Sequence, residues 1–130
     1  MRSLGALLLG DGRFGEPLRR ELLEARPVVF EEGLRGTYVP REGREYTRNP
    51  TRGAVAVCAN RFVVWSRRSK TVDVPLTRPW LDRMTVAERP AGRLVVGMTL
   101  PRDGAPTGTL EVRLRTPAAG RVVALLANVR

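Results

Sequence analysis

Three glycines near the N-terminus have a spacing that can bind phosphate. Gly10, Gly12 and Gly15 read G-x-G-x-x-G, with a short apolar run before them and a helix-like run after them. In dinucleotide-binding domains this motif places a pyrophosphate at the N-terminus of a helix that starts at the second glycine. Pro17 would lie inside such a helix and would cost about 3 kcal/mol there. We therefore predict a helix that begins near Glu16, after a flexible segment.

A dinucleotide site also needs a parallel sheet and an acidic residue for the ribose. Glu31 or Glu32 stands about where that acid would lie. A parallel sheet, however, needs crossover helices, and the pattern between Val28 and Arg115 predicts none. The glycine spacing is therefore interpreted as fortuitous, and we expect no nucleotide cofactor.

Basic residues are the second group that could bind a ligand. The net charge is +10, and Lys70 is the only lysine. Guanidinium groups donate paired hydrogen bonds to phosphate and carboxylate, so an anionic partner is one interpretation and a merely solvated surface is the other. The candidate anion-binding residues fall in the loop after the first predicted strand and in the turn after Trp65: Arg41, Arg44, Arg48, Arg52, Arg67, Arg68 and Lys70.

The composition argues against an enzyme. The chain has no histidine and a single cysteine, Cys58, which lies within an apolar strand-like run. Without histidine the usual general base and the commonest metal ligand are missing. We therefore predict a buried Cys58, no catalytic residues, no metal and no cofactor. No apolar run approaches the roughly 20 residues that span a bilayer, and the N-terminus lacks a proper signal-peptide pattern, so we expect a cytoplasmic protein.

The order of elements predicts a mainly β domain. A helix over residues 17–25 is followed by alternating apolar and polar residues, and Thr116 and Pro117 then mark the start of a second helix. We divide the chain into an N-terminal segment, residues 1–26, and a domain, residues 27–130, with a polar loop over Pro40–Thr51. The predicted strands are Val28–Val39, Arg52–Ala59, Arg61–Arg67, Thr71–Val74, Arg83–Glu88, Arg93–Leu100 and Thr109–Arg115.

The stretch Gly53–Leu76, GAVAVCANRFVVWSRRSKTVDVPL, resembles pleckstrin-homology-like (PH-like) domains of the bacterial and GRAM type. The resemblance implies a seven-stranded antiparallel open barrel that is closed by the C-terminal helix. Such domains bind phosphoinositide headgroups, peptides or proteins, and some bacterial members assemble into rings. This chain lacks the basic-x-Arg pair that ends their lipid signature, because Arg52 is followed by glycine and alanine. The residues expected to face the barrel interior are Val122, Leu125, Leu126 and Val129.

These observations predict a non-enzymatic binding or assembly module. Its partner would be an anionic ligand, an anionic membrane surface or another protein, and self-association is left open. The alternative is a small basic protein that binds nucleic acid or a nucleotide. That alternative is less favoured because aromatic residues, on which bases stack, make up only 5% of the chain.

Overall fold

Alternating apolar residues build one antiparallel sheet in this protein. The fold is given by a computed structural model, which describes residues 10–42, 45–46, 49–100 and 108–129. Its helices are α2 (Glu16–Glu24), α3 (Arg78–Leu81) and α4 (Ala119–Ala127). Its strands are β1 (Val29–Glu42), β2 (Glu45–Tyr46), β3 (Asn49–Val57), β4 (Arg61–Ser66), β5 (Ser69–Pro75), β6 (Met84–Arg89), β7 (Arg93–Leu100) and β8 (Gly108–Arg115).

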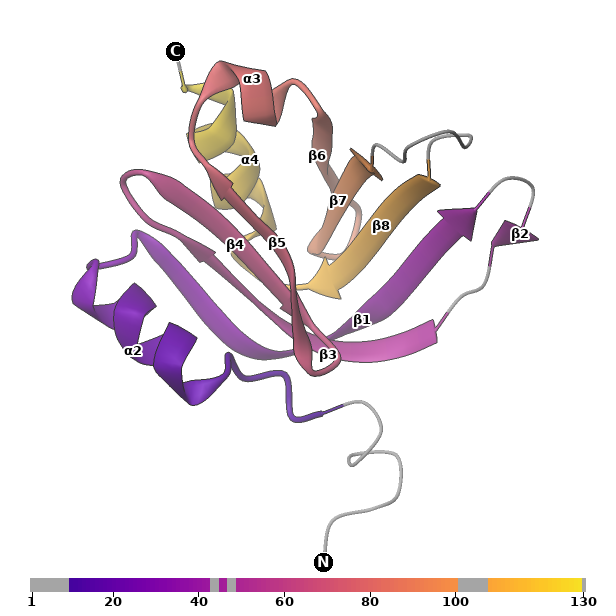
Figure 1. Cartoon of the computed structure of the whole chain (residues 1–130), viewed down its shortest axis with the longest axis horizontal. Helices are drawn as coiled ribbons and strands as arrows, with labels where there is room; N and C mark the ends of the chain where they lie inside the picture. The colour runs from indigo at the N-terminus through magenta and orange to yellow at the C-terminus, as the bar shows by residue number, and fades with distance from the viewer. Residues whose placement is uncertain (1–9, 43–44, 47–48, 101–107, 130) are drawn as a thin grey trace, which may run out of the picture.

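Seven strands form a continuous sheet in the order β5-β4-β3-β1-β8-β7-β6, and the short β2 pairs with β1. All described strand pairs are antiparallel, so the sheet differs from the parallel sheet of a dinucleotide-binding domain. The long strand β1 joins the two halves, and a bulge between Glu31 and Leu34 interrupts its register with β3. The sheet curls into a half-barrel that is open between its edge strands (Figure 1).

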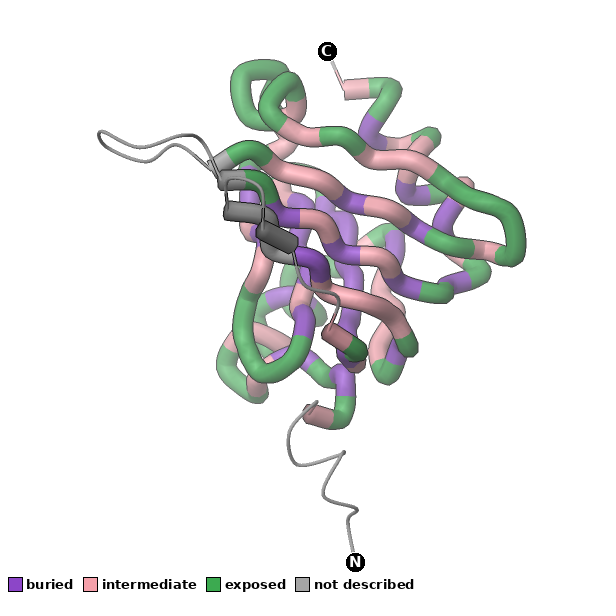
Figure 2. The backbone as a smooth tube through the Cα atoms, turned by 90° about the vertical axis from the view of Figure 1, so that its right-hand side faces the viewer, coloured by how far each residue is buried: buried purple, intermediate pink, exposed green. Residues whose placement is uncertain are grey.

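The concave face of the sheet holds the main core, and α4 closes it. Burial alternates along strands such as β5 and β8 (Figure 2), because successive side chains point to opposite faces, whereas β3 and β4 are buried on both faces over most of their length. Val122 and Leu126 of α4 are buried against this face, as predicted. Leu125 packs only at the border of the core, and Val129 is half-buried beyond the end of the helix. The prediction for these two residues is therefore met only in part.

The convex face carries a second apolar cluster beneath α2. Leu22 of α2 is fully buried there, and Phe14 is nearly so. They pack against Ala54 and Ala56 of β3, Cys58 directly after β3, and Val63 of β4. Because the β3 residues are small, the helix can approach the sheet closely. The division of the chain at residue 26 stays a prediction, although α2 shares a core with the strands.

The predicted elements are present, with shifted ends. Strand β1 continues to Glu42 and β3 begins at Asn49, so both ends of the predicted loop Pro40–Thr51 belong to strands. The stretch was predicted as a loop because it is polar, yet Pro50 lies opposite Thr37 in the sheet, since the φ of proline is compatible with an extended chain. The two-residue strand β2 and the single-turn helix α3 were not predicted.

The C-terminal helix starts later than predicted. Pro117 and Ala118 form a turn after Thr116, and α4 begins at Ala119. The hydroxyl of Thr116 still accepts a hydrogen bond from the backbone N–H of Ala118, at 3.1 Å. Thr116 therefore caps the turn that leads into the helix, although it is not the residue next to the helix.

Candidate functional site

The N-terminal glycines pack against the sheet and do not form a phosphate loop. Gly12 has a φ of 76°, and its carbonyl accepts a hydrogen bond from the N–H of Gly33 at 2.9 Å. A Cβ atom on Gly12 would lie 2.9 Å from the Cα of Gly33, and one on Gly15 would lie 3.1 Å from the Trp65 ring. The glycine spacing therefore serves close backbone approach. Interpreting residues 10–15 as a flexible segment was wrong, because Gly12 and Phe14 are buried.

The acidic residue considered for a ribose is also engaged in packing. The carboxylate of Glu32 accepts a hydrogen bond from the N–H of Phe14 at 3.0 Å and forms an ion pair with Arg19 at 3.0 Å. It thus joins the segment ahead of α2, and α2 itself, to β1. The helix begins at Glu16 with Pro17 in its first turn, as predicted.

The basic turn after Trp65 is the tip of the β4–β5 hairpin. Ser66 pairs with Ser69, so Arg67 and Arg68 form a two-residue turn, and Arg67 takes a left-handed φ of 59°. The N–H of Arg67 donates to the hydroxyl of Thr51 at 2.8 Å and to the carbonyl of Arg52 at 3.1 Å. Thr51 is buried, so the turn is anchored to β3 from inside the sheet.

Residues of this turn line a cavity at the end of the barrel, which we call the mouth cavity. It has a volume of about 320 Å³. Arg67 and Lys70 both line it, although the ammonium of Lys70 lies 3.0 Å from the carboxylate of Asp73, and the hydroxyls of Ser66 and Thr71 hydrogen-bond to each other at its wall. In such a pair one hydroxyl hydrogen is used, and the other remains free to be donated. The described residues that line it are Tyr38, Ser66, Arg67, Ser69, Lys70, Thr71 and Leu110.

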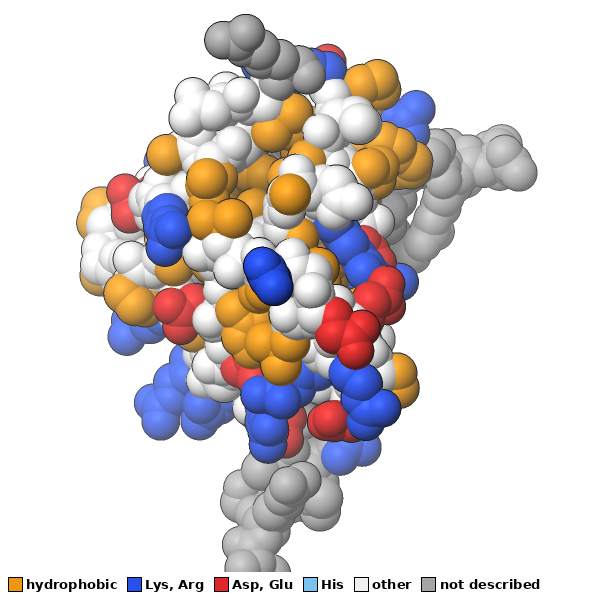
Figure 3. All heavy atoms as spheres, turned by 90° about the vertical axis from the view of Figure 1, so that its left-hand side faces the viewer, with side chains coloured by type: hydrophobic (Ala, Val, Ile, Leu, Met, Phe, Trp, Pro, Cys, Tyr) orange, Lys and Arg blue, Asp and Glu red, His pale blue; other side chains and the backbone are white. Residues whose placement is uncertain are grey.

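An ion-pair network beside the cavity lowers its charge. Lys70 lies 3.0 Å from Asp73, which also accepts two hydrogen bonds from Arg61. The bond from Arg61 holds the pKa of Asp73 below its ordinary value, and the same bond raises the pKa of Arg61. Arg61 further contacts Glu21 of α2 at 2.7 Å. In the lower half of the face shown in Figure 3, basic and acidic side chains accordingly lie next to one another.

The structure brings together part of the predicted anion-binding set. Arg67 and Lys70 line one cavity, and Arg68 is exposed at the turn tip beside them. Arg52 follows Thr51 on β3, but its guanidinium reaches the carbonyl of Gly33 at 3.4 Å instead of the cavity. Arg44, Arg48 and the side chain of Arg41 lie outside the described residues.

The hydroxyl groups of the mouth cavity were missed in the sequence. The available signal was the run of Ser66, Ser69 and Thr71 around a basic turn. Tyr38 had no such signal, because it reaches the cavity from β1, a strand far away in the sequence.

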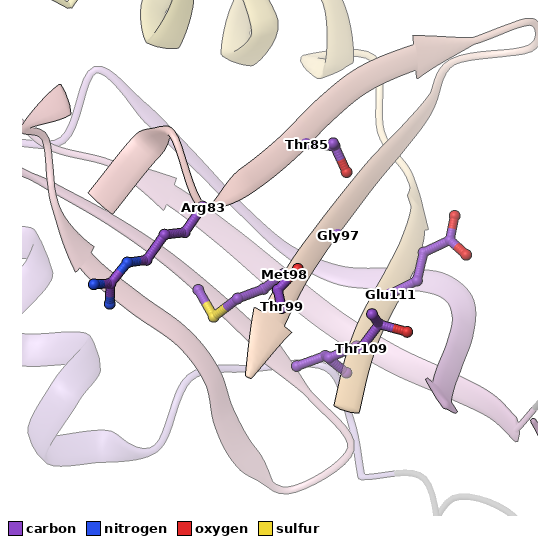
Figure 4. A pocket seen from close by; sticks show the side chains of 8 residues that line it. Arg83, Thr85, Gly97, Met98, Thr99, Thr109 and Glu111 are labelled. Atoms are coloured by element: carbon purple, nitrogen blue, oxygen red, sulfur yellow. The ribbon is translucent and has the colours of Figure 1, made fainter. Parts of the chain in front are cut away.

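A smaller hollow lies on the convex face over Gly97 (Figure 4), with a volume of about 190 Å³. Thr85 and Glu111 lie on either side of this glycine, and a Cβ atom on Gly97 would lie 2.6 Å from the hydroxyl oxygen of Thr85. Arg83 points away from the hollow's other side chains, and its guanidinium lies 5.3 Å from the centre of the Trp80 ring. A glutamate and threonines offer neither a nucleophile–base pair nor a cationic surface, so we assign this hollow no function.

The remaining reactive group is buried. Cys58 is 2% exposed, as predicted, and desolvation by burial raises the pKa of its thiol, which keeps it protonated. Within the described ranges, no three residues of the types Asp, Glu, Cys and His come together as a metal site. None of the described helices has the length and apolarity to cross a membrane. No protein-family model matches the chain, and no curated protein matches its sequence.

Proposed function

We propose that this chain is a non-enzymatic binding module of the PH-like type, and that its ligand is a phosphate-bearing anion held at the mouth cavity. Three features support the PH-like assignment: seven antiparallel strands arranged as two meanders, β1-β3-β4-β5 and β6-β7-β8, the long β1 that pairs with a strand of each, and the helix α4 on the concave side. The resemblance of Gly53–Leu76 implies the seven antiparallel strands and the closing C-terminal helix. The proposal includes no catalytic step and no cofactor.

The observation that carries the proposal is the lining of the mouth cavity. Arg67 and Lys70 surround one hollow with four hydroxyl-bearing side chains, and no carboxylate is among the described lining residues. Hydrogen bonds from cationic and hydroxyl donors to phosphate oxygens are short and strong. Leu110 adds an apolar wall. A phosphomonoester suits this lining, because its oxygens accept several hydrogen bonds at once.

The charge at the cavity makes binding dependent on salt. Lys70 forms an ion pair with Asp73, so Arg67 supplies most of the unpaired positive charge at the cavity. Arg68 is exposed at the same turn and adds to the field. At 0.1 M salt, the attraction between exposed charges decays over a distance of about 10 Å because dissolved ions screen it. We expect affinity to fall as the salt concentration rises.

Two sources of the phosphomonoester can be separated in one experiment. Phosphatidylcholine vesicles with and without a phosphoinositide test a lipid headgroup, and soluble inositol trisphosphate tests a free ligand. The variant R67Q/R68Q/K70Q should lose most of the binding to whichever probe is bound. The variant R13Q/R20Q/R121Q removes the same charge from exposed arginines elsewhere and should retain binding.

A second variant separates hydrogen bonding from charge. S66A/T71A keeps every charge and removes the paired hydroxyls at the cavity wall. We expect it to weaken binding without changing the salt dependence. Equal losses in R67Q/R68Q/K70Q and R13Q/R20Q/R121Q, or no binding of either probe at low salt, would contradict the proposed function.

A further inference from the structure

Five arginines from five neighbouring strands form one row across the sheet, which we call the arginine row. Arg89 lies opposite Arg93, and Arg93 lies opposite Arg115. Farther along the sheet Arg35 lies opposite Arg52. Gly36 pairs with Leu114 in the antiparallel strands β1 and β8. The next position along this pair places Arg35 opposite Arg115, which joins the two halves of the row. The row therefore runs from β6 through β7, β8 and β1 to β3: Arg89, Arg93, Arg115, Arg35 and Arg52.

The row belongs to the convex face. Leu94 and Leu114 are buried on the concave side, so their neighbours Arg93 and Arg115 point to the other side. Figure 2 shows the same alternation of burial along the strands. Arg35, Arg93 and Arg115 line one hollow of about 310 Å³ together with Arg113. The row thus lies on a different face from the mouth cavity and is separate from the proposed function.

The row carries uncompensated charge. Among the described residues, none of its members forms an ion pair; Arg52 alone donates a long hydrogen bond, to the carbonyl of Gly33. The neighbouring Glu111 is hydrogen-bonded to Arg113, at 3.3 and 3.4 Å. Four members of the row are exposed, and Arg52 is half-buried.

This arrangement destabilises the protein on its own. Like charges directly opposite each other on neighbouring strands repel, and the row contains three such pairs. A bound polyanion would remove that repulsion and release its own counterions. The row is therefore a surface whose charge is compensated by a partner.

We infer that the arginine row binds the backbone of single-stranded nucleic acid without regard to base sequence. Strands lie about 4.8 Å apart, so five strands present a line of charge about 19 Å long that follows the curl of the sheet. A flexible chain of phosphates can follow such a curved line. No member of the row is aromatic, and neither is any described residue of its hollow, so these residues offer contacts to phosphate and none for base stacking.

A membrane fits this surface less well. A planar bilayer would meet only part of a curved row. Among the described residues, the exposed large apolar side chains are Leu23, Val28 and Trp80, and none of them belongs to the row or its hollow. The face therefore lacks groups that would insert among lipid chains.

The test measures the fluorescence anisotropy of a labelled oligo(dT) with the full chain over a range of salt concentrations. Each phosphate contact on a single strand contributes about −0.7 to the slope of log K against log salt, so five contacts give about −3.5. The variant R89Q/R93Q/R115Q should shift the slope by about 2 and lower the affinity at low salt by at least tenfold. The variant R13Q/R20Q/R121Q has the same net charge and should leave the slope nearly unchanged.

Two additional measurements keep the inference falsifiable. R93K/R115K retains the charge and should keep most of the affinity, which guards against loss through misfolding. R89Q/R93Q/R115Q should melt at a higher temperature than the wild type at low salt, because it relieves repulsion. Equal losses in both triple variants, an absence of oligo(dT) binding, or binding only to anionic phosphatidylserine vesicles or to duplex DNA would overturn the inference. The variant R67Q/R68Q/K70Q distinguishes this inference from the proposed function, since it should lose phosphomonoester binding but still bind oligo(dT) through the arginine row.

Discussion

Asp73 accepts two hydrogen bonds from the guanidinium of Arg61, one from Nε at 2.8 Å and one from Nη2 at 2.7 Å. This pair joins β4 to β5, and the further contact between Arg61 and Glu21 ties α2 to both strands. The helix and the hairpin beneath it are therefore held by one charged group as well as by the apolar cluster.

The stability of the protein should fall in acid through Asp73. Its folded-state pKa lies below the ordinary value of 3.8, chiefly because of the bond from Arg61, so the carboxylate stabilises the fold above that value. The contribution is complete at neutral pH and is lost as the pH falls through the folded-state pKa. The change Asp73→Asn should cost about 1–3 kcal/mol at neutral pH and much less in strong acid. Urea unfolding at several pH values measures this difference. Asp82→Asn, in the exposed pair with Arg78, is the control and should change stability by less than about 1 kcal/mol at any pH.

Gly12 should be intolerant of a side chain for structural reasons. The change Gly12→Ala forces an L-residue into a φ of 76° and places its Cβ against the backbone of Gly33, so we expect a loss of about 1–3 kcal/mol. Gly33→Ala is a matched control, since Gly33 has a similar φ of 72° but its Cβ position has only an ordinary contact, with the carbonyl oxygen of Asp11 at 4.0 Å. Its cost should be smaller, about 1 kcal/mol. Thermal unfolding compares the two variants.

Titration with NAD is the functional counterpart of that experiment. We expect no saturable binding to the wild-type chain, because the three glycines pack against the sheet and Glu32 is engaged with Phe14 and Arg19. Saturable binding that Gly12→Ala abolished would contradict this interpretation.

The closure of the barrel by α4 should depend on specific helix positions. Leu126 is 6% exposed and packs in the main core, so Leu126→Ala should destabilise the fold by about 2–5 kcal/mol. Leu125 lies at the border of that core and is only half-buried, so Leu125→Ala should cost clearly less. Chemical denaturation measures both. Equal costs would mean that α4 sits in another orientation.

Cys58 should be unreactive in the native state. It is buried under α2, and burial raises the pKa of its thiol, so little thiolate is available for attack. Labelling with a thiol reagent at mildly alkaline pH should be slow in the folded protein and fast in denaturant. The change Leu22→Ala loosens the helix over this cluster and should speed the labelling. Rapid labelling of the wild type would show that α2 does not cover the strand.

Local pattern predicted the elements well. The alternation of Leu94, Val96 and Met98 placed β7 at the bounds that the structure gives, and Pro17 placed the start of α2. Side chains in a strand alternate between faces and proline restricts the helix start, so both signals act within a few residues. The same reasoning failed over Pro40–Thr51, where pairing between distant strands extends β1 and β3 in spite of two prolines.

The sequence by itself determined an all-antiparallel β domain with flanking helices, a strong positive charge and a buried cysteine, because periodicity, composition and turn chemistry are local properties. Tertiary structure alone decided which residues meet. Register set Arg93 opposite Arg115, the curl of the sheet brought Tyr38 to the turn at Arg67, and the packing of residues 10–15 turned a phosphate-like glycine pattern into a close backbone contact. Such pairings depend on strand order and register over long distances in the chain, and no short stretch of sequence encodes them.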